Sequence, residues 1–398
     1  MVDVRPFRAL FPPPELAARV ASVPYDVVDT AEARALAAGN AHSYLHVTRA
    51  EIDMPPGTDE HSDAVYAAGR AALEAFQRQG TLRREAAPVF YVYRLTWQGR
   101  SQTGVVGAFS VEDYERDRIL KHEKTRPDKE EDRTRHILAL EAHAEPVFLL
   151  HRPDAAVQAL IDRAAAGAPL SRFTAPDGVE HTLWRVSETE PLRAAFAAVP
   201  RLYVADGHHR SAAALNARRR LQEQGRPGGE RFLAVTFPAP ELRILPYHRL
   251  ILDLSGKSPG DLLAALPGLR PVADGESAPG EARVYCQGAW RAFPLQPLRQ
   301  DPVSLLDPQA LQDRVLGPLL GIMDPRTDQR IKFVGGIRGT PSLAQAVDQG
   351  KAVLAFAMAP VQVAQLIAVS DAGLTMPPKS TWFEPKLRSG LFVLPLAE

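Results

Sequence analysis

The sequence predicts a mixed α/β protein of the α+β class. Short apolar runs that are typical of strands lie among segments with helical periodicity, and the two kinds do not alternate strictly along the 398 residues. The chain shows no internal repeat and no heptad pattern. Its hydrophobic content of 45% and charged content of 24% are those of an ordinary globular protein, and its length allows two or three domains.

Most of the predicted elements lie in the first 254 residues. An amphipathic helix is predicted over 62–79, since its apolar residues fall on one face and Gly80 can end it. The turn residues Gln98-Gly99-Arg100 predict a β-hairpin between the runs 88–97 and 103–111. Further helices are expected near 30–38 and 155–166, and further strands over 146–151, 181–187 and 231–237.

The stretch 255–280 is rich in Gly, Pro and Asp and is interpreted as a linker. We therefore expect a first region over 1–254, into which the hairpin and a charged loop are inserted. An α+β region is expected over 281–398, beginning with a hairpin that turns at Gln287-Gly288. This second region is expected to return to the functional site through 375–386.

Composition excludes several classes of partner. Lys and Arg together number 47, as do Asp and Glu, so no basic field indicates nucleic acid or an anionic membrane. Cys286 is the only cysteine, which excludes an intramolecular disulfide and fits a reducing cytosol. The N-terminus has no signal-peptide pattern, and Pro360 breaks the apolar stretch 352–369, which indicates a strand and a helix rather than a membrane span. We therefore expect a cytoplasmic protein.

The segment 201–215 is the most informative part of the chain. The apolar run 202–205 predicts a buried strand, and the alanine-rich stretch beyond it predicts a helix that ends near Gly225. Between them stand Asp206, Gly207, His208, His209 and Arg210. Gly207 permits a tight turn, and the N-terminus of a helix offers phosphate free N–H groups and positive dipole character. The segment predicts an anion-handling or phosphoryl-transfer site.

Each of these residues has a chemical use. Asp206 can bind Mg²⁺ or act as a base, and the two histidines with Arg210 can hold phosphate oxygens. A plain structural explanation is a capped helix, with Asp206 as the cap and one histidine in the core. Four polar groups between a strand and a helix are costly to desolvate without a function, which favours a site. Zinc is disfavoured because the pair of histidines has no obvious third ligand.

A second polar segment, 121–133, offers two interpretations that the sequence leaves open. As a mobile loop, it would supply His122, Glu123 and either Asp132 or Arg133 to a cleft. As a solvated charge run, it would have no such role.

The segment 375–386 is a third candidate. Three prolines would stiffen it, and its polar side chains could meet an anion: Lys379, Ser380, Thr381 and Lys386. A terminal loop held on the core by aromatic residues is the alternative. Asp26, in Val23-Pro24-Tyr25-Asp26-Val27, is either a base or a turn residue. His248, in Pro246-Tyr247-His248-Arg249, is either functional or a core histidine.

The common nucleotide motifs are absent from the sequence. It contains no GxxxxGK[ST] loop, no GxGxxG between a strand and a helix, no protein-kinase motif set and no GxSxG elbow. A phosphate-transferring chain of this sequence would therefore work outside the common nucleotide folds.

Seven motifs together resemble a known family. They are Arg5-Pro6-Phe7, Pro24-Tyr25-Asp26-Val27, His122-Glu123-Lys124-Thr125, Asp132-Arg133, Asp206-Gly207-His208-His209-Arg210, Pro246-Tyr247-His248-Arg249 and Met376-Pro377-Pro378-Lys379-Ser380-Thr381. Their order resembles that of the bacterial and archaeal family named domain of unknown function ten-fifteen. The resemblance runs from near residue 4 to near residue 395.

The element 201–217 is also similar to one in the ParB and sulfiredoxin-like superfamily, which includes CTP-binding partition proteins and free-serine kinases of the SerK type. In those proteins the element lies beside nucleotide phosphates. The resemblance implies a ParB-like nucleotide-binding core built from 1–50 and 200–254, with large insertions and a C-terminal region. Ser211 stands where relatives often carry an aromatic residue.

The leading hypothesis is a small-molecule kinase that phosphorylates the hydroxyl of free L-serine or a similar metabolite. ATP or ADP would be the donor and Mg²⁺ the cofactor, held by Asp206 and the backbone around Gly207. His208, His209 and Arg210, with His122 and Arg133, would stabilise the phosphate charge. Glu123 is the candidate base, and Asp26 is the alternative. The phosphate or the substrate carboxylate would meet Lys379, Ser380, Thr381 and Lys386.

Two alternatives stay open: a non-catalytic nucleotide-binding regulator of ParB type, and a phosphate-ester hydrolase or nucleotidyltransferase. The expected partners are a small-molecule substrate and a nucleotide, with no membrane and no nucleic acid. A homodimer is a possible assembly.

Overall fold

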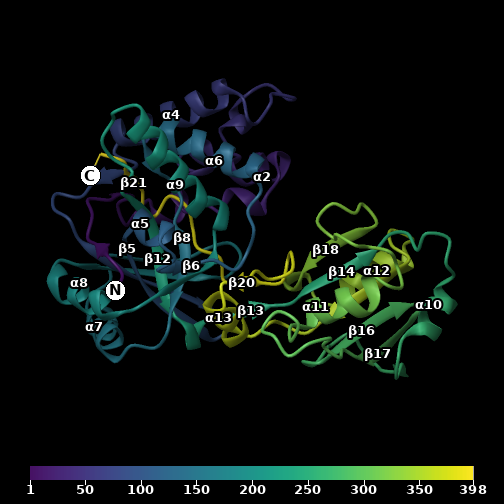
Figure 1. Cartoon of the computed structure of the whole chain (residues 1–398). Helices are drawn as coiled ribbons and strands as arrows, with labels where there is room; N and C mark the ends of the chain where they lie inside the picture. The colour runs from purple at the N-terminus through teal and green to yellow at the C-terminus, as the bar shows by residue number, and fades with distance from the viewer. Residues whose placement is uncertain (398) are drawn as a thin grey trace. The chain divides into compact units, whose positions relative to one another are not determined.

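The computed structural model describes residues 1–397, which form two units. The first unit comprises Met1–Leu242 and Pro385–Glu398, and the second comprises Arg243–Glu384. The second unit is thus inserted into the sequence of the first. Both units combine sheets and helices (Figure 1), so the predicted α+β class is confirmed.

A nine-stranded sheet forms the centre of the first unit. Its strands follow the order β6-β11-β8-β12-β5-β4-β10-β9, and β1 pairs with β5. Most neighbours are antiparallel, whereas β11 pairs with β6 and β12 with β8 in parallel. The strands are β1 (Val4–Arg5), β4 (Phe90–Trp97), β5 (Arg100–Ser110), β6 (Ile119–Leu120), β8 (Val147–His151), β9 (Ser171–Thr174), β10 (Glu180–Val186), β11 (Leu202–Asp206) and β12 (Arg231–Pro238). The hairpin predicted around Gln98-Gly99-Arg100 is confirmed as β4 and β5.

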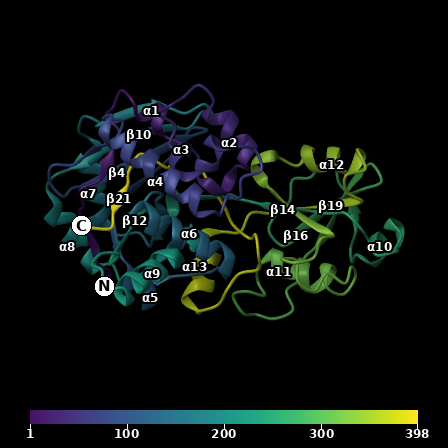
Figure 2. The ribbon, with the colours of Figure 1, turned by 90° about the horizontal axis from the view of Figure 1, so that it is seen from above.

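Helices cover both faces of this sheet. One face packs in a single apolar core against α5 (Val111–Glu115), α7 (Ala155–Ala165), α8 (Thr189–Ala198) and α9 (His208–Glu223). Figure 2 shows α3 (Leu45–Thr48) and α4 (Asp63–Arg78) on the other side of β12 from α5 and α9. On that second face the C-terminal segment also contacts the sheet, with the ring of Phe392 4.6 Å from that of Tyr91. Helix α6 (Pro127–Leu140) packs against both α4 and α9 (Figure 1).

The charged segment 121–133 differs from the predicted mobile loop. From Pro127 onward it belongs to α6, and Asp132 and Arg133 are buried. A proline at the first helical position, followed by Asp128 in the first turn, is a typical helix start. The expectation of a loop was wrong here because α6 buries polar side chains, so its inner face lacks an apolar periodicity.

The second unit is built on a six-stranded sheet with the order β15-β17-β16-β19-β14-β18. These strands are β14 (Tyr247–Ile251), β15 (Arg270–Pro271), β16 (Glu281–Cys286), β17 (Ala289–Pro294), β18 (Ile331–Gly335) and β19 (Leu354–Met358). Alternate residues of β19 face two separate apolar cores. Figure 2 shows α11 (Asp307–Leu311) on one side of this sheet and α12 (Pro341–Asp348) on the other.

The segment 255–280, interpreted above as a linker, lies within the second unit. It contains α10 (Pro259–Ala265) and β15, and Leu262 and Leu263 are buried in the core. Pro259 begins α10, and Pro271 ends β15. The stretch 352–369 forms β19 and the start of α13 (Val363–Asp371), as predicted. In the described part of the chain, no helix combines the length and the apolar character needed to cross a membrane.

Candidate functional site

The turn between β11 and α9 forms the base of the candidate site. Gly207 precedes the first residue of α9 and has a φ of +95°, a conformation that is costly for residues with a Cβ. A Cβ at this position would also lie 3.1 Å from both Cζ and Nε of Arg210. The glycine therefore lets the chain turn sharply while the Arg210 guanidinium packs against the turn.

Two helices begin at this site. The residue before α6, Arg126, donates its backbone N–H to Nε2 of His209 at 3.1 Å. Further along both helices, Asn216 donates to a carboxylate oxygen of Glu130 at 3.2 Å, and Ile137 packs in one cluster with Leu221. These contacts follow the same order in both helices, so α6 and α9 run in the same direction. Their positive dipole ends therefore lie together, which favours a bound anion.

Asp206, at the end of β11, is held between two cations. Its Oδ2 lies 3.1 Å from Nζ of Lys386 and 3.6 Å from Nη2 of Arg210. Burial opposes ionisation of Asp206, but the charges of Lys386 and Arg210 outweigh burial and hold the pKa of its carboxyl well below the ordinary value. Asp206 is therefore ionised, and it orients a lysine that is 180 positions distant in the sequence.

The segments 122–123 and 206–210 meet at His208. The ring of His122 lies 4.4 Å from that of His208, nearly perpendicular to it, and the backbone N–H of His122 points to Nε2 of His208 at 3.5 Å. If Nε2 accepts this hydrogen, the proton of the neutral ring is on Nδ1, which lies 3.7 Å from Oε2 of Glu123.

Both rings are neutral at physiological pH. Burial lowers the pKa of His208 to about 4, in spite of the charge of Asp206, and lowers the pKa of His122 to about 3. The side chain of Glu123 is 38% exposed. The arrangement thus places a solvent-accessible carboxylate beside a buried, neutral donor of hydrogen bonds.

Behind this turn lies a network of buried charges that the sequence analysis missed in part. Glu145 accepts hydrogen bonds from the backbone N–H of Tyr25 at 3.1 Å and from the hydroxyl of Ser389 at 2.9 Å. Nη1 of Arg133 lies 3.7 Å from Glu145, and its guanidinium stacks 3.9 Å from the centre of the Tyr25 ring. The only sequence signal for Glu145 is an acidic residue directly before an apolar strand.

Arg210 belongs to the same network. It donates a hydrogen bond to the backbone oxygen of Pro146, which begins the approach to β8. Burial alone would lower the pKa of Arg210, but the carboxylates of Asp206, Asp26 and Glu145 raise it above the ordinary value. The guanidinium is therefore charged although it is buried. Asp26, on the 3₁₀ turn η1 (Tyr25–Val27), is exposed and acts on this guanidinium electrostatically.

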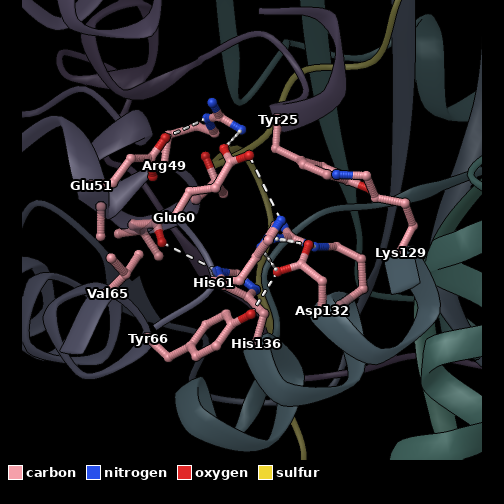
Figure 3. A pocket seen from close by; sticks show the side chains of 14 residues that line it. Tyr25, Arg49, Glu51, Glu60, His61, Val65, Tyr66, Lys129, Asp132 and His136 are labelled. Carbon is pink, nitrogen blue, oxygen red and sulfur yellow. Dashed lines mark hydrogen bonds and ion pairs between the residues drawn. The ribbon is translucent and has the colours of Figure 1, made fainter. Parts of the chain in front are cut away.

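Figure 3 shows a small polar pocket whose lining includes His61, Tyr66 and Asp132. Asp132 accepts hydrogen bonds there from the hydroxyl of Tyr66 at 2.7 Å and from Nδ1 of His61 at 2.9 Å. Its other oxygen pairs with Arg133 at 2.8 Å. The volume open to the centre of a water molecule is about 20 Å³, which is room for about one water. Because Asp132 lies on α6 and Tyr66 on α4, the hydrogen bond between them joins these two helices.

The sequence of the chain matches one family model. The model described as "Protein of unknown function (DUF1015)" covers residues 4–309. The chain belongs to this family. A search of the curated proteins gave no match.

Several solved structures show a distant similarity to the chain. SbnI from Staphylococcus aureus, with a C-terminal truncation, has 15% identity and a TM-score of 0.41, over 73% of this chain and 88% of its own. A free serine kinase in complex with AMP has 13% identity and a TM-score of 0.37, over 74% and 91%. A conserved hypothetical protein from Pyrococcus furiosus has 14% identity and a TM-score of 0.35, over 73% and 94%.

The predicted residues of the segment 375–386 divide between the two units. Lys386 belongs to the first unit and contacts Asp206, whereas Lys379, Ser380 and Thr381 belong to the second. Ser380 donates its hydroxyl to the backbone oxygen of Pro377 at 2.7 Å, and Nζ of Lys379 lies 5.7 Å from the centre of the Tyr247 ring. A role of these three residues in binding phosphate stays a prediction.

A preformed metal cage is not found among residues 1–397, since no three His, Cys, Asp or Glu side chains come together there as ligands. Asp206 could contribute one carboxylate. Mg²⁺ commonly binds through one or two carboxylates together with phosphate oxygens and water. The donor set therefore fits Mg²⁺ only where phosphate supplies the remaining ligands.

Proposed function

We propose that the first unit of this DUF1015 protein is a small-molecule kinase that transfers phosphate from a nucleotide to a metabolite hydroxyl. The observation that carries the proposal is the meeting of two helix N-termini with His208, Arg210 and Lys386 at one turn. Phosphoryl transfer depends mainly on positioning and on stabilising negative charge, and this turn offers both. The acceptor that we favour is free L-serine.

The residues at the turn have distinct proposed roles. Backbone N–H groups at the start of α9, with His208, His209 and Arg210, bind the phosphates of the donor. Lys386 reaches the same phosphates, since it already lies at Asp206. His122 supports His208 from behind, and Arg133 supports Arg210 through Glu145.

Glu123 is the proposed base, with Asp26 as the alternative. Its carboxylate takes the proton of the acceptor hydroxyl while the hydroxyl oxygen forms a bond to the terminal phosphorus. The bond from that phosphorus to the bridging oxygen of the donor breaks, so ATP leaves as ADP, or ADP as AMP. Mg²⁺ bound to the donor phosphates would offset their negative charge, and Asp206 is the carboxylate that we assign to it.

The nucleotide and L-serine are the most specific parts of the proposal. They rest on the resemblance of 201–217 to the phosphate-binding element of free-serine kinases, and we place this element in a ParB-like core. The geometry of the turn supports an anion site in general. A nucleotide-binding regulator would use the same turn without turnover, so the test must separate binding from catalysis.

The test is a product search by mass spectrometry. The purified full chain is incubated with Mg²⁺, with each of ATP, ADP and pyrophosphate, and with a panel of hydroxylated metabolites led by L-serine. We expect phosphoserine with a nucleotide donor, and we expect Asp206→Ala and His208→Ala to abolish it. Glu112→Gln, which removes an exposed carboxylate on α5, is the matched control and should retain activity.

Three results would contradict the proposal. Nucleotide binding without any product, with every donor and acceptor, would favour the regulator. Release of phosphate without a phosphorylated acceptor would favour a hydrolase. Full activity of a folded His208→Ala variant would remove the assigned site, whatever the reaction.

A further inference from the structure

The second unit buries a cation that has no acidic partner. Arg249, on β14, is 2% exposed, and its guanidinium donates hydrogen bonds only to backbone oxygens, those of Tyr247 and of Lys379, the latter at 3.4 Å. Within residues 1–397, its Nε has no hydrogen-bond partner, and no carboxylate is among the groups that shift its pKa. Burial lowers the pKa of Arg249 to about 10, so the side chain stays charged at neutral pH. Burying such a charge without a counter-ion is costly.

This arginine lines a cavity of about 350 Å³, which is within the range of small-molecule sites. The cavity lies entirely within the second unit, and its wall is mixed. Polar side chains line part of it, among them Asp324 and Arg326, which form an exposed ion pair with each other at 4.0 Å. The apolar lining includes Leu316, Met323, Phe333, Met376, Pro377 and Pro378. The Phe333 ring lies 5.1 Å from the Arg249 guanidinium, and the Met323 side chain is 79% exposed. The cavity thus combines one buried cation, an exposed ion pair and a set of apolar side chains.

A second buried polar atom without a hydrogen-bond partner belongs to a residue of the cavity wall, on a distorted helical turn. At η4 (Gln312–Leu316), Gly317 donates its backbone N–H to the oxygen of Gln312 at 2.9 Å, a π-type bond between residues five apart. The Gln312 side chain lines the cavity and donates to the backbone oxygen of Ile322 at 2.7 Å, whereas its Oε1 has no partner within the described chain. Single π turns are frequent at functional sites.

The cavity also explains two motifs that the kinase proposal does not use. The motif Pro246–Arg249 supplies the buried arginine, and the motif 376–381 supplies part of the wall and the backbone oxygen that accepts from it. The rings of Tyr247 and Trp382 meet at 5.2 Å and join the two segments. Segments more than 125 positions apart in the sequence therefore build one cavity. The two residues of the Arg249–Lys379 hydrogen bond are 130 positions apart.

We propose that this cavity binds a small organic anion, with its carboxylate or phosphate group at Arg249 and its apolar body against Phe333 and Met323. The anion would supply the counter-charge that the protein does not provide. The apolar side chains of the wall, Phe333 beside Arg249 above all, favour an anion with a hydrophobic body over a bare inorganic ion. This inference stands independently of the proposed kinase reaction in the first unit.

The test is isothermal titration calorimetry of the full chain with four probes. Benzoate and phenyl phosphate carry the two anionic groups on an apolar ring, benzyl alcohol is the neutral analogue, and inorganic phosphate lacks the ring. We expect saturable binding of benzoate or phenyl phosphate, with at least about tenfold weaker binding of the other two probes. The stronger of the two anionic probes identifies the head group.

Three variants locate the binding. Arg249→Met removes the charge and should abolish binding, while Met323→Trp narrows the mouth of the cavity, leaves Arg249 in place and should weaken binding about tenfold or more. If Arg249→Met does not fold, Met323→Trp still tests the site. Arg338→Gln, which removes an exposed arginine outside the cavity, is the control and should bind as the wild type does.

Two outcomes would overturn the proposal. One is the absence of saturable binding of every anionic probe to folded protein at millimolar concentrations. The other is binding that survives Met323→Trp and Arg249→Met but is lost in His208→Ala, which would assign the anion to the first unit.

Discussion

The two units bury positive charge in opposite ways. In the first unit, Arg133 and Arg210 lie among the carboxylates of Asp132, Glu145 and Asp206, so each buried cation has buried or half-buried anions beside it. In the second unit, Arg249 meets only backbone oxygens. The first arrangement is balanced without a ligand, whereas the second leaves a charge for a ligand to balance.

The difference shows how burial can serve two purposes. Paired buried ions contribute little net stability compared with apolar residues of the same shape, but removing one partner is strongly destabilising because the other is left uncompensated. The network of the first unit therefore fixes the geometry of the turn at Gly207. Removing an unpaired buried arginine leaves no carboxylate without its counter-ion. The protein can tolerate the free-energy cost of burying such a charge where a bound ligand balances it.

Acidification should produce the largest difference in stability between the two units. Within the described residues, burial lowers the pKa of several histidines of the first unit and of His248 in the second. Those of the first unit are His122, His136, His143, His151, His181 and His208. For each, the unfolded chain binds a proton more readily than the folded chain, so stability falls as the pH drops from 6.5 towards the folded pKa. For His208, with a folded pKa of about 4, the loss amounts to about 3 kcal/mol.

Hydrogen exchange at pH 7 and pH 5, corrected for intrinsic rates, measures this effect. We expect amides of β11 and α9 to lose protection before those of β14 and β19. If both units lose protection together, or the second loses it first, the buried neutral histidines do not make the first unit the more acid-sensitive one.

Replacing one buried arginine in each unit should destabilise the first unit much more than the second. Arg133→Met leaves Asp132 and Glu145 buried without their cation, and should lower the free energy of unfolding by about 3–5 kcal/mol. Arg249→Met removes a charge that has no carboxylate partner, and should change it by about 1 kcal/mol or less, because the relieved burial offsets two lost hydrogen bonds. Urea unfolding of both variants is the measurement. Equal losses would show that Arg249 is a structural residue like Arg133.

The turn at Gly207 should be less costly to alter. Gly207→Ala forces a side chain into a positive-φ conformation and against Arg210, and should lower the free energy of unfolding by about 1–2 kcal/mol. The rate of phosphate transfer should also fall, by more than the loss of folded protein explains, because Arg210 must move. Gly260→Ala, within α10 and with only the Ser258 hydroxyl at 3.8 Å, is the matched control and should be neutral or slightly stabilising. If Gly207→Ala behaves as the control does, the turn is not strained.

The smallest effect on stability should come from Glu123. Its side chain is 38% exposed and 3.7 Å from His208, so Glu123→Gln should change the free energy of unfolding by less than about 0.5 kcal/mol. As the proposed base, however, it should lower kcat about 10²–10⁴-fold with little change in the KM for nucleotide. A quenched-flow or coupled assay beside urea unfolding separates the two readouts. Unchanged kcat in Glu123→Gln with lowered kcat in Asp26→Asn would move the role of the base to Asp26.

Local chemistry was sufficient to predict much of the fold from the sequence. The strand, glycine turn and helix around Gly207 were predictable because an apolar run, a residue free to adopt positive φ and an alanine-rich stretch each act over a few neighbours. The hairpin of β4 and β5 and the helix α4 were predictable for the same reason. The helix α6 was not, because its buried face is polar and its stability comes from partners distant in sequence.

Only the tertiary structure decided which polar side chains meet. His122 and His208 are 86 positions apart, Asp206 and Lys386 are 180 apart, and Glu145 and Ser389 are 244 apart, so no local pattern could pair them. The sequence indicated that the segment 201–215 handles an anion and that the segment 375–386 is polar and stiff. The division of that second segment, with Lys386 at Asp206 and Lys379 beside Arg249, follows from chain topology, because the pairing of β13 (Arg243–Leu245) with β20 (Trp382–Glu384) closes the second unit just before Pro385.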